Sequence, residues 1–151
     1  ALAGAKFYPQ FEASEFFSND IDVVVFAVSV LSFEEVLKSI PSTFFKGKLV
    51  VDVLSVKTHA KETMLESLPL EADIMCTHPM FGPDSGANGW SGLPFVYERV
   101  RVTDHSRAAD FLSIWEKERC RMVEMSCELH DKYAANTQFI THLTGRILGK
   151  Q

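Results

Sequence analysis

The sequence has few cysteines, no clustered positive charge and no long apolar run. Its three cysteines, Cys76, Cys120 and Cys127, are an odd number without framework spacing, which favours reduced thiols over a disulfide scaffold. No stripe of Arg and Lys indicates nucleic-acid binding, and no apolar stretch is long enough to cross a bilayer. The net charge of −5 and the 46% hydrophobic content are ordinary for a globular protein. We therefore expect neither a nucleic-acid partner nor a membrane partner.

The N-terminus also lacks recognisable targeting features. It has no initiator Met, no hydrophobic signal core and no transit segment rich in Ser and Arg. With 151 residues, we expect one domain, or one domain and part of a second, taken from a longer protein.

Two Cys/His pairs raise the alternative of a zinc site. Cys76-x-His78 and Cys127-x-x-His130 could each supply half of the ligands. The paired Cys-rich spacing of structural zinc sites is absent, however, so we predict no metal.

Three strands that alternate with helices organise the first half of the chain. The segments 21–28 and 49–54 are mostly apolar and rich in β-branched residues, as is typical of parallel strands buried on both faces. The segment 72–77 is expected to be the third strand. A helix is expected between Ser32, its N-cap with Glu35 as capping-box partner, and Pro41. A second helix is expected over 58–68, with Met64, Leu65 and Leu68 inward. Before these elements, 6–11 is at best an edge strand, broken by Pro9, and 12–20 is a loop or short helix.

The second half continues with a strand at 95–102, a helix at 107–119 and a last strand at 121–125. An apolar stripe on the helix is predicted to face the core rather than a cofactor: Ala108, Phe111, Leu112 and Trp115. From Glu128 to Leu148 we expect one long helix with a broad apolar face. The predicted fold is a partial Rossmann-like α/β domain (1–126) with a mostly parallel sheet and flanking helices, followed by the start of an all-α dimerisation domain (127–151).

One polar residue follows or ends each of the three buried strands: Ser29, Ser55 and His78. Ligands of parallel sheets bind beyond these carboxyl ends. The stretch 76–86, with two prolines and two glycines, can hold His78 as a general base. The residues alone also allow a surface turn with an incidental histidine. The loop 79–94, with four glycines and three prolines, is too long for a bare connector.

Several segments together form a specific pattern: Asp52-Val53-Leu54-Ser55-Val56-Lys57, Thr77-His78-Pro79-Met80-Phe81-Gly82-Pro83, Asn88-Gly89-Trp90, Leu93-Pro94-Phe95-Val96, Cys120-Arg121-Met122-Val123-Glu124-Met125 and His130-Asp131-x-Tyr133-Ala134-Ala135. From about Ile21 onward, the chain resembles the plant-type arogenate/prephenate dehydrogenases of tyrosine biosynthesis. The His-Pro-Met-Phe-Gly-Pro element is the most specific part of the match.

The resemblance implies an oxidative decarboxylation that depends on NADP, with NAD as the alternative. Hydride leaves ring C4, the C4 hydroxyl loses its proton, and carbon dioxide departs as the ring becomes aromatic. His78 matches the catalytic histidine, and Ser55 the serine that orients the ring hydroxyl and the nicotinamide. Ser29 and Gly82 are assigned to the cofactor, and close backbone approach over the loop 82–86 calls for glycine. Three residues on the long helix are assigned to the substrate, arogenate or prephenate: Gln138, Thr141 and His142.

The sequence departs from the family pattern because it contains no Gly-x-Gly-x-x-Gly stretch. That turn holds the cofactor pyrophosphate at a helix N-terminus. We expect a missing βαβ unit of about 30 or more residues, which leaves the strand at 21–28 with an open edge. The alternative function is therefore a truncated, inactive family member or interaction fragment. The resemblance also implies a homodimeric parent protein in the plastid stroma, with the cytosol as alternative.

Overall fold

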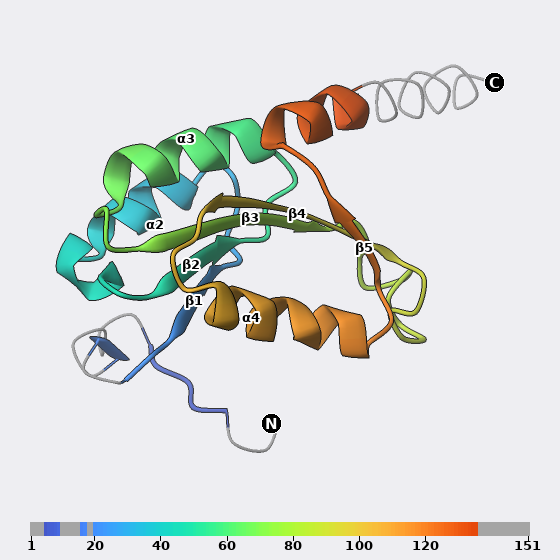
Figure 1. Ribbon diagram of the computed structural model, residues 1–151, viewed down its shortest axis with the longest axis horizontal. Coiled ribbons are helices and arrows are strands. Elements are labelled where there is room, and N and C mark those ends of the chain that lie inside the picture. The colour runs from blue at the N-terminus through green and yellow to red at the C-terminus, as the bar shows by residue number, and fades with distance from the viewer. Residues whose placement is uncertain (1–4, 10–15, 18–19, 136–151) are drawn as a thin grey trace.

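A computed structural model describes residues 5–9, 16–17 and 20–135, and every structural statement below concerns these residues. They form one five-stranded sheet with the order β1-β2-β3-β4-β5 (Figure 1). The strands are β1 (Val23–Phe26), β2 (Leu49–Asp52), β3 (Asp73–Pro79), β4 (Pro94–Arg101) and β5 (Arg121–Glu124). β1, β2 and β3 pair in parallel, as do β4 and β5, whereas β3 and β4 are antiparallel. The predicted mostly parallel sheet is confirmed.

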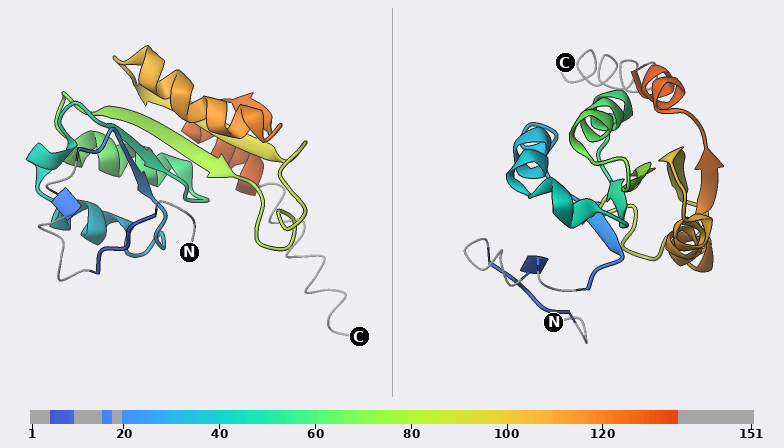
Figure 2. Two further views of the ribbon diagram at one scale, coloured as in Figure 1. Left: turned by 90° about the horizontal axis from the view of Figure 1, so that it is seen from below. Right: turned by 60° about the vertical axis from the view of Figure 1, so that its left-hand side comes forward.

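Helices cover both faces of the sheet, which gives three layers (Figure 2). They are α2 (Phe33–Ser39), the 3-10 turn η2 (Ser42–Phe45), α3 (Lys57–Ser67) and α4 (His105–Lys117), and a further helix occupies 127–135. α2 and α3 lie on one face and α4 on the other (Figure 1). In β2, Val50 packs into the α2/α3 core, while Leu49 and Val51 pack into the α4 core. All four residues of β2 are buried, as predicted from its continuous apolar run.

β1 departs from its predicted burial. It lies at the end of the described sheet, with β2 as its neighbour, so its other edge is open. Val24 and Phe26 are buried, but Val25 points to the opposite face and is 47% exposed. The prediction that β1 is buried on both faces is wrong, because α4 covers the half of the sheet that lies away from β1. The predicted open edge of β1 is found among the described residues. No strand is assigned to 6–9, and 10–11 lie outside the described residues.

Two details of the helices also differ from expectation. Ser32 makes no capping bond, because a turn places its hydroxyl against the carbonyl of Ser29, to which it donates at 3.2 Å. The predicted capping box with Glu35 is therefore wrong. In α3, Met64 and Leu68 are buried as expected, but Leu65 is exposed and the prediction that it faces inward is wrong.

Aromatic rings fix the long loop after β3 to α4. Trp115 of α4 stacks on Phe95 of β4 at 4.2 Å and on Trp90 of the loop at 5.2 Å between ring centroids. Phe81, near the start of the loop, contacts Trp90 at 5.4 Å. The apolar stripe of α4 is thus core, as predicted. Among the loop glycines, Gly86 is the crowded one, since a Cβ there would lie 3.1 Å from the carbonyl oxygen of Gly82.

The helix 127–135 is tied to the domain by charged groups. Lys61 of α3 bridges Glu98 of β4 and Glu128, at 2.8 and 2.9 Å. Glu98 also accepts the backbone N–H of Cys127 at 2.6 Å. Burial opposes ionisation of Glu98, but these bonds hold the pKa of its carboxyl below the usual value. The predicted continuation of this helix to Leu148 lies outside the described residues. None of the described helices is long and apolar enough to span a membrane.

Candidate active site

The carboxyl ends of the three parallel strands surround one hollow of about 410 Å³. Ser29 and Val30 follow β1, Ser55 follows β2, and His78 and Pro79 end β3; all five line the hollow. Parallel strands end at the same edge of a sheet, so residues about 25 positions apart in sequence meet there. The structure therefore brings together Ser29, Ser55 and His78, the three polar residues that the strand pattern singled out.

His78 is held by the sheet rather than by a loop. β3 continues through His78 to Pro79, and these residues pair with Val96 and Phe95 of β4. The expectation that the strand ends before His78, with the histidine in the following loop, is wrong. The added antiparallel strand β4 extends the ladder by two residues, so the backbone of His78 has the rigidity of a paired strand.

The His78 ring contacts a second histidine. Its Nδ1 lies 2.8 Å from Nε2 of His130, which comes from the helix 127–135 and is only 3% exposed. The other ring nitrogen of His130, Nδ1, lies 2.9 Å from a carboxylate oxygen of Asp131. The three side chains form a continuous chain from the strand-end hollow to the start of α3.

Asp131 closes this chain on the backbone of α3. Its Oδ1 accepts the N–H of Lys57 at 2.9 Å, and its Oδ2 accepts the N–H of Thr58 at 2.8 Å. An anionic acceptor at a helix N-terminus satisfies orphan N–H groups and interacts favourably with the helix dipole. Burial would raise the pKa of Asp131, but the two N–H groups and His130 lower it to about 2. Asp131 is therefore ionised at neutral pH.

A buried ion pair lies beneath the hollow. The Lys57 ammonium donates to Asp52, at the end of β2, and to the carbonyl of Thr77 in β3 at 2.5 Å. The two charged side chains are 2% and 0% exposed. Burial raises the pKa of the Asp52 carboxyl, while Lys57 and the N–H of Leu54 favour its ionised form. This pair joins both ends of the turn that carries Ser55 and ties that turn to the strand that carries His78.

The surroundings keep the His78 ring neutral. Burial has the largest effect, followed by the neighbouring His130 and the Lys57 ammonium, and together they lower the pKa of His78 to about 4; Asp131 opposes them. A neutral imidazole has one nitrogen with a free lone pair, and such a nitrogen can accept a proton. The site therefore presents a general base over a wide pH range.

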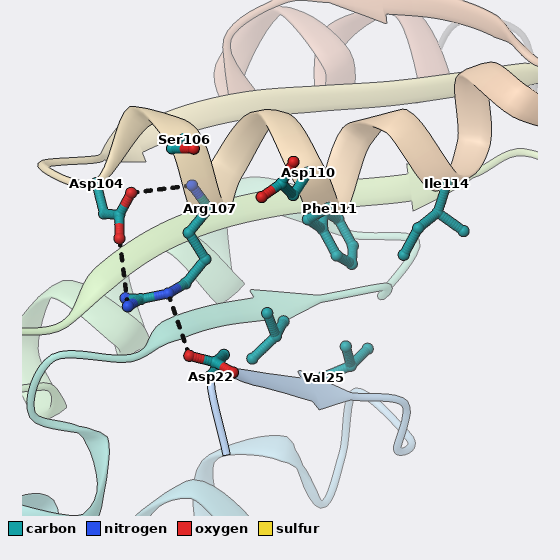
Figure 3. Close-up of a pocket in the computed structure, with 9 residues that line it drawn as sticks. Asp22, Val25, Asp104, Ser106, Arg107, Asp110, Phe111 and Ile114 are labelled. Atoms are coloured by element: carbon teal, nitrogen blue, oxygen red, sulfur yellow. Dashed lines mark hydrogen bonds and ion pairs between the residues drawn. The ribbon is translucent and has the colours of Figure 1, made fainter. Parts of the chain in front are cut away.

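A larger hollow, of about 590 Å³, lies away from these groups, between β1 and the N-terminal half of α4 (Figure 3). Its Arg107 pairs with two carboxylates, at 3.8 Å from Asp22 and 3.2 Å from Asp104. Val25 and Ile114 supply apolar surface. No histidine, cysteine or lysine lines it. This groove is the uncovered side of the open sheet edge, so its size does not indicate catalysis.

The remaining residues predicted for the site are less constrained. Gln138, Thr141 and His142 lie outside the described residues. Gly82 lies in the exposed loop, where nothing in the described chain comes within 4 Å of a Cβ at this position. Within the described chain, a residue with a side chain would therefore fit at position 82 without a steric clash.

Four residues that contact the site were not assigned roles from the sequence: Asp52, Lys57, His130 and Asp131. In the sequence these residues appear only as parts of the family motifs. More than 70 residues separate Lys57 from His130, so their proximity becomes visible only in the folded structure. Within the described residues, no cluster of three or more His, Cys, Asp or Glu side chains is arranged to hold a metal ion. His78 and His130 bond to each other instead.

A mostly parallel sheet, covered on both faces, with a ligand-sized hollow and a neutral histidine at its strand ends defines a nucleotide-binding α/β domain of the dehydrogenase class. The profile described as "Prephenate dehydrogenase, nucleotide-binding domain" matches residues 9–124, well over half of the chain. The chain therefore belongs to the prephenate dehydrogenase family.

Named relatives agree with this membership. Over 134 residues the chain is 54% identical to arogenate dehydrogenase 2, chloroplastic, of Arabidopsis thaliana, which covers 85% of the chain and 37% of the relative. Over 155 residues it is 46% identical to arogenate dehydrogenase 1, chloroplastic, of the same plant, covering 99% of the chain and 24% of the relative. The chain thus spans only about a quarter to two fifths of the length of these relatives.

Solved structures show the same fold. The chain superposes on prephenate dehydrogenase from Aquifex aeolicus with a TM-score of 0.69 and 24% identity, covering 85% of the chain and 48% of that protein. Against arogenate dehydrogenase from Synechocystis the TM-score is 0.65 with 19% identity, covering 81% of the chain and 44% of that protein. At these identities the likeness defines the fold alone, and it confirms the predicted Rossmann-like class.

Proposed function

We propose that this chain forms the catalytic-base side of an arogenate or prephenate dehydrogenase that performs oxidative decarboxylation with a nicotinamide cofactor in tyrosine biosynthesis. The observation that carries the proposal is the neutral His78 ring at the carboxyl end of β3, beside Ser29 and Ser55. Both relatives named above are called arogenate dehydrogenases. Arogenate is therefore the first substrate to test, and prephenate the second.

In this reaction His78 accepts the proton of the ring hydroxyl at C4. As hydride leaves C4, that carbon gains carbonyl character and the hydroxyl becomes more acidic, so a base within hydrogen-bond reach lowers the barrier. The electron pair of the breaking carbon–carboxylate bond enters the ring, and carbon dioxide leaves. The Ser55 hydroxyl orients the ring hydroxyl toward His78. The buried Lys57–Asp52 pair keeps the Ser55 turn and β3 in register.

The residues of the strand-end hollow suit the nicotinamide end of the cofactor. The hollow is lined by the apolar residues Ala27, Val28 and Val53 together with the hydroxyls of Ser29 and Ser55, a mixture typical of cofactor sites. When bound, a nicotinamide supplies the hydride acceptor. Ser29 and Gly82 are proposed to contact it. No residue of the chain is assigned to the pyrophosphate, because no Gly-x-Gly-x-x-Gly stretch is present.

Further properties of the whole protein follow from the same proposal. We propose NADP as the preferred cofactor, Gln138, Thr141 and His142 as substrate contacts, and a homodimer in which residues 127–151 begin the helical domain. Both Arabidopsis relatives carry the word chloroplastic in their names, which supports a plastid location over the cytosol. The alternative is an inactive interaction fragment, which is favoured if the chain binds no nicotinamide cofactor.

The test replaces His78 by Asn in the intact protein and measures reduction of NADP or NAD with arogenate and with prephenate. We expect kcat to fall by about 10²–10⁴-fold, the usual contribution of a general base, while cofactor binding measured by NADPH fluorescence stays near normal. The matched control is His105→Asn at the exposed start of α4, which should keep full activity. A mild loss in His78→Asn would remove the catalytic role, and absence of cofactor binding in the unsubstituted protein would favour the inactive alternative.

A further inference from the structure

Three side chains form a hydrogen-bonded line beside the strand-end hollow, and the order of their donors and acceptors has a chemical consequence. His130, in the middle of the line, is buried, and Asp131 is 27% exposed. Nδ1 of His78 lies 2.8 Å from Nε2 of His130, and Nδ1 of His130 lies 2.9 Å from Oδ1 of Asp131. Both distances are within hydrogen-bond range. Each contact needs one donor and one acceptor, so the proton positions along the line depend on one another.

Asp131 sets the direction of the line. An ionised carboxylate can only accept hydrogen bonds, and both of its oxygens already accept backbone N–H groups from Lys57 and Thr58. His130 must therefore donate from Nδ1. A neutral imidazole carries one N–H, so Nε2 of His130 is an acceptor and the N–H of His78 must be at Nδ1. Nε2 of His78 is then the nitrogen without a proton.

We propose that His130 and Asp131 are positioning residues that fix His78 in the tautomer with the proton on Nδ1, which leaves Nε2 free to take the hydroxyl proton of the substrate. This inference rests on the proposed dehydrogenase function for the identity of that hydroxyl. Because His130 occupies Nδ1, Nε2 is the nitrogen left for a ligand in the hollow that His78 lines.

The proton balance of the step is simple. The hydroxyl proton moves to Nε2 of His78 while hydride leaves C4, the ring carbon that bears this hydroxyl. The Nδ1 proton stays on His78. His78 becomes an imidazolium whose Nδ1–H donates to His130. Hydrogen bonds from a charged donor are stronger than those from a neutral one. This hydrogen bond and the Asp131 carboxylate favour the imidazolium, against burial and the neighbouring groups that lower the pKa of His78.

The groups around His78 are consistent with this arrangement. His130 and Asp131 face it from the helix 127–135, and the Lys57 ammonium faces it from α3. Lys57 carries positive charge and disfavours a second proton on His78, which favours the neutral state of that ring. Asp131 is anchored to the first turn of α3 and cannot turn away without leaving two N–H groups unpaired.

The first test reads the tautomer directly and requires no enzymatic activity. Side-chain ¹⁵N NMR of the chain with labelled histidine, assigned by loss of signals in His78→Asn, reports which ring nitrogen carries hydrogen. We expect His78 at neutral pH with Nδ1 protonated and Nε2 bare. A His78 ring protonated at Nε2, or an even mixture of tautomers, would overturn the inference.

Two variants of His130 separate positioning from mere packing. His130→Gln offers an amide oxygen near the place of Nε2, whereas His130→Leu fills the space without an acceptor. We expect the Gln variant to keep the His78 tautomer and the Leu variant to lose it, with backbone amide spectra showing that both are folded. The same His78 tautomer in both variants would contradict the proposal, since a positioning role requires the acceptor.

Kinetics on the intact protein give the second readout. His130→Leu should lower kcat by roughly tenfold to a hundredfold, part of the ~10²–10⁴-fold contribution of a general base, with KM nearly unchanged, and His130→Gln should recover most of the loss. An unchanged kcat in His130→Leu would refute the positioning role. If the unsubstituted protein oxidises neither arogenate nor prephenate, the proposed function fails, while the NMR result still decides the tautomer.

Discussion

Two hollows of this domain differ in what surrounds them more than in how large they are. The groove between β1 and α4 is the larger of the two, at about 590 Å³, and its Arg107 pairs with Asp22 and Asp104 near the surface. The strand-end hollow, at about 410 Å³, is backed by the buried Lys57–Asp52 pair and by the partly buried line from His78 to Asp131.

Buried polar groups are costly unless they are fully paired, so they persist where the fold over-determines them. At the strand ends, Lys57, His130 and Asp131 each bond to groups that lie far away in the sequence. In the groove, Arg107 also bonds to distant groups, Asp22 and the carbonyl of Gly47, but its carboxylate partners are exposed: Asp104 to 40% and Asp22 to 80%. This difference in burial is the reason why we propose the strand-end hollow as the functional site.

The largest expected effect on stability is at the buried pair. Lys57→Met removes the cation and leaves the Asp52 carboxylate buried, which should lower the free energy of unfolding by about 3–5 kcal/mol. Arg107→Met in the groove removes a partly exposed cation and should cost about 1 kcal/mol or less. Urea unfolding followed by the fluorescence of Trp90 and Trp115 measures both.

A double variant sharpens this prediction. Asp52→Asn combined with Lys57→Met removes both charges, so it should recover part of the stability lost in Lys57→Met alone. Equal losses in Lys57→Met and Arg107→Met would contradict the distinction between the two regions.

The sequence predicted the sheet and its strand-end residues because both depend on local patterns. Apolar runs rich in β-branched residues predicted β1 and β2, the alternation with helices predicted β3, and the strand ends marked Ser29, Ser55 and His78. The roles of Lys57 and Asp131 could not be predicted, since their bonding partners are set by tertiary contact. Leu65 was misassigned for the same reason: its spacing suits an inward face, but among the described residues its side chain is 42% exposed. The capping box failed because Ser32 takes part in a competing turn.

Replacing the aspartate that caps a helix in each region should have an intermediate effect on the free energy of unfolding. Asp104 caps its own helix α4 by accepting the N–H of Arg107, whereas Asp131 caps α3 from another helix. Asp104→Ala should cost about 0.5–2 kcal/mol, the usual value of an N-cap. Asp131→Ala should cost more, because it also leaves the buried N–H of His130 unpaired, at about 1–3 kcal/mol.

Thermal unfolding of the two cap variants, compared with the unsubstituted chain, measures this difference. A larger shift in Asp104→Ala than in Asp131→Ala would show that the line from His78 to Asp131 adds nothing to the cap. The intact protein supplies a second comparison, since only Asp131→Ala should also reduce activity.

The last expected effect is a loss of stability in acid that arises from His78 at the strand ends. The pKa of His78 is about 4 in the folded chain, against about 6.5 for an unperturbed histidine. A group with a lower pKa when folded binds more protons when unfolded, so between these values acid favours unfolding. The contribution of His78 to the free energy of unfolding should therefore be fully present above about pH 6.5 and be lost as the pH falls toward about 4. Urea midpoints measured across this range should fall less steeply in His78→Asn than in the exposed-histidine control His105→Asn, and parallel curves for the two variants would show that His78 titrates as an ordinary surface histidine.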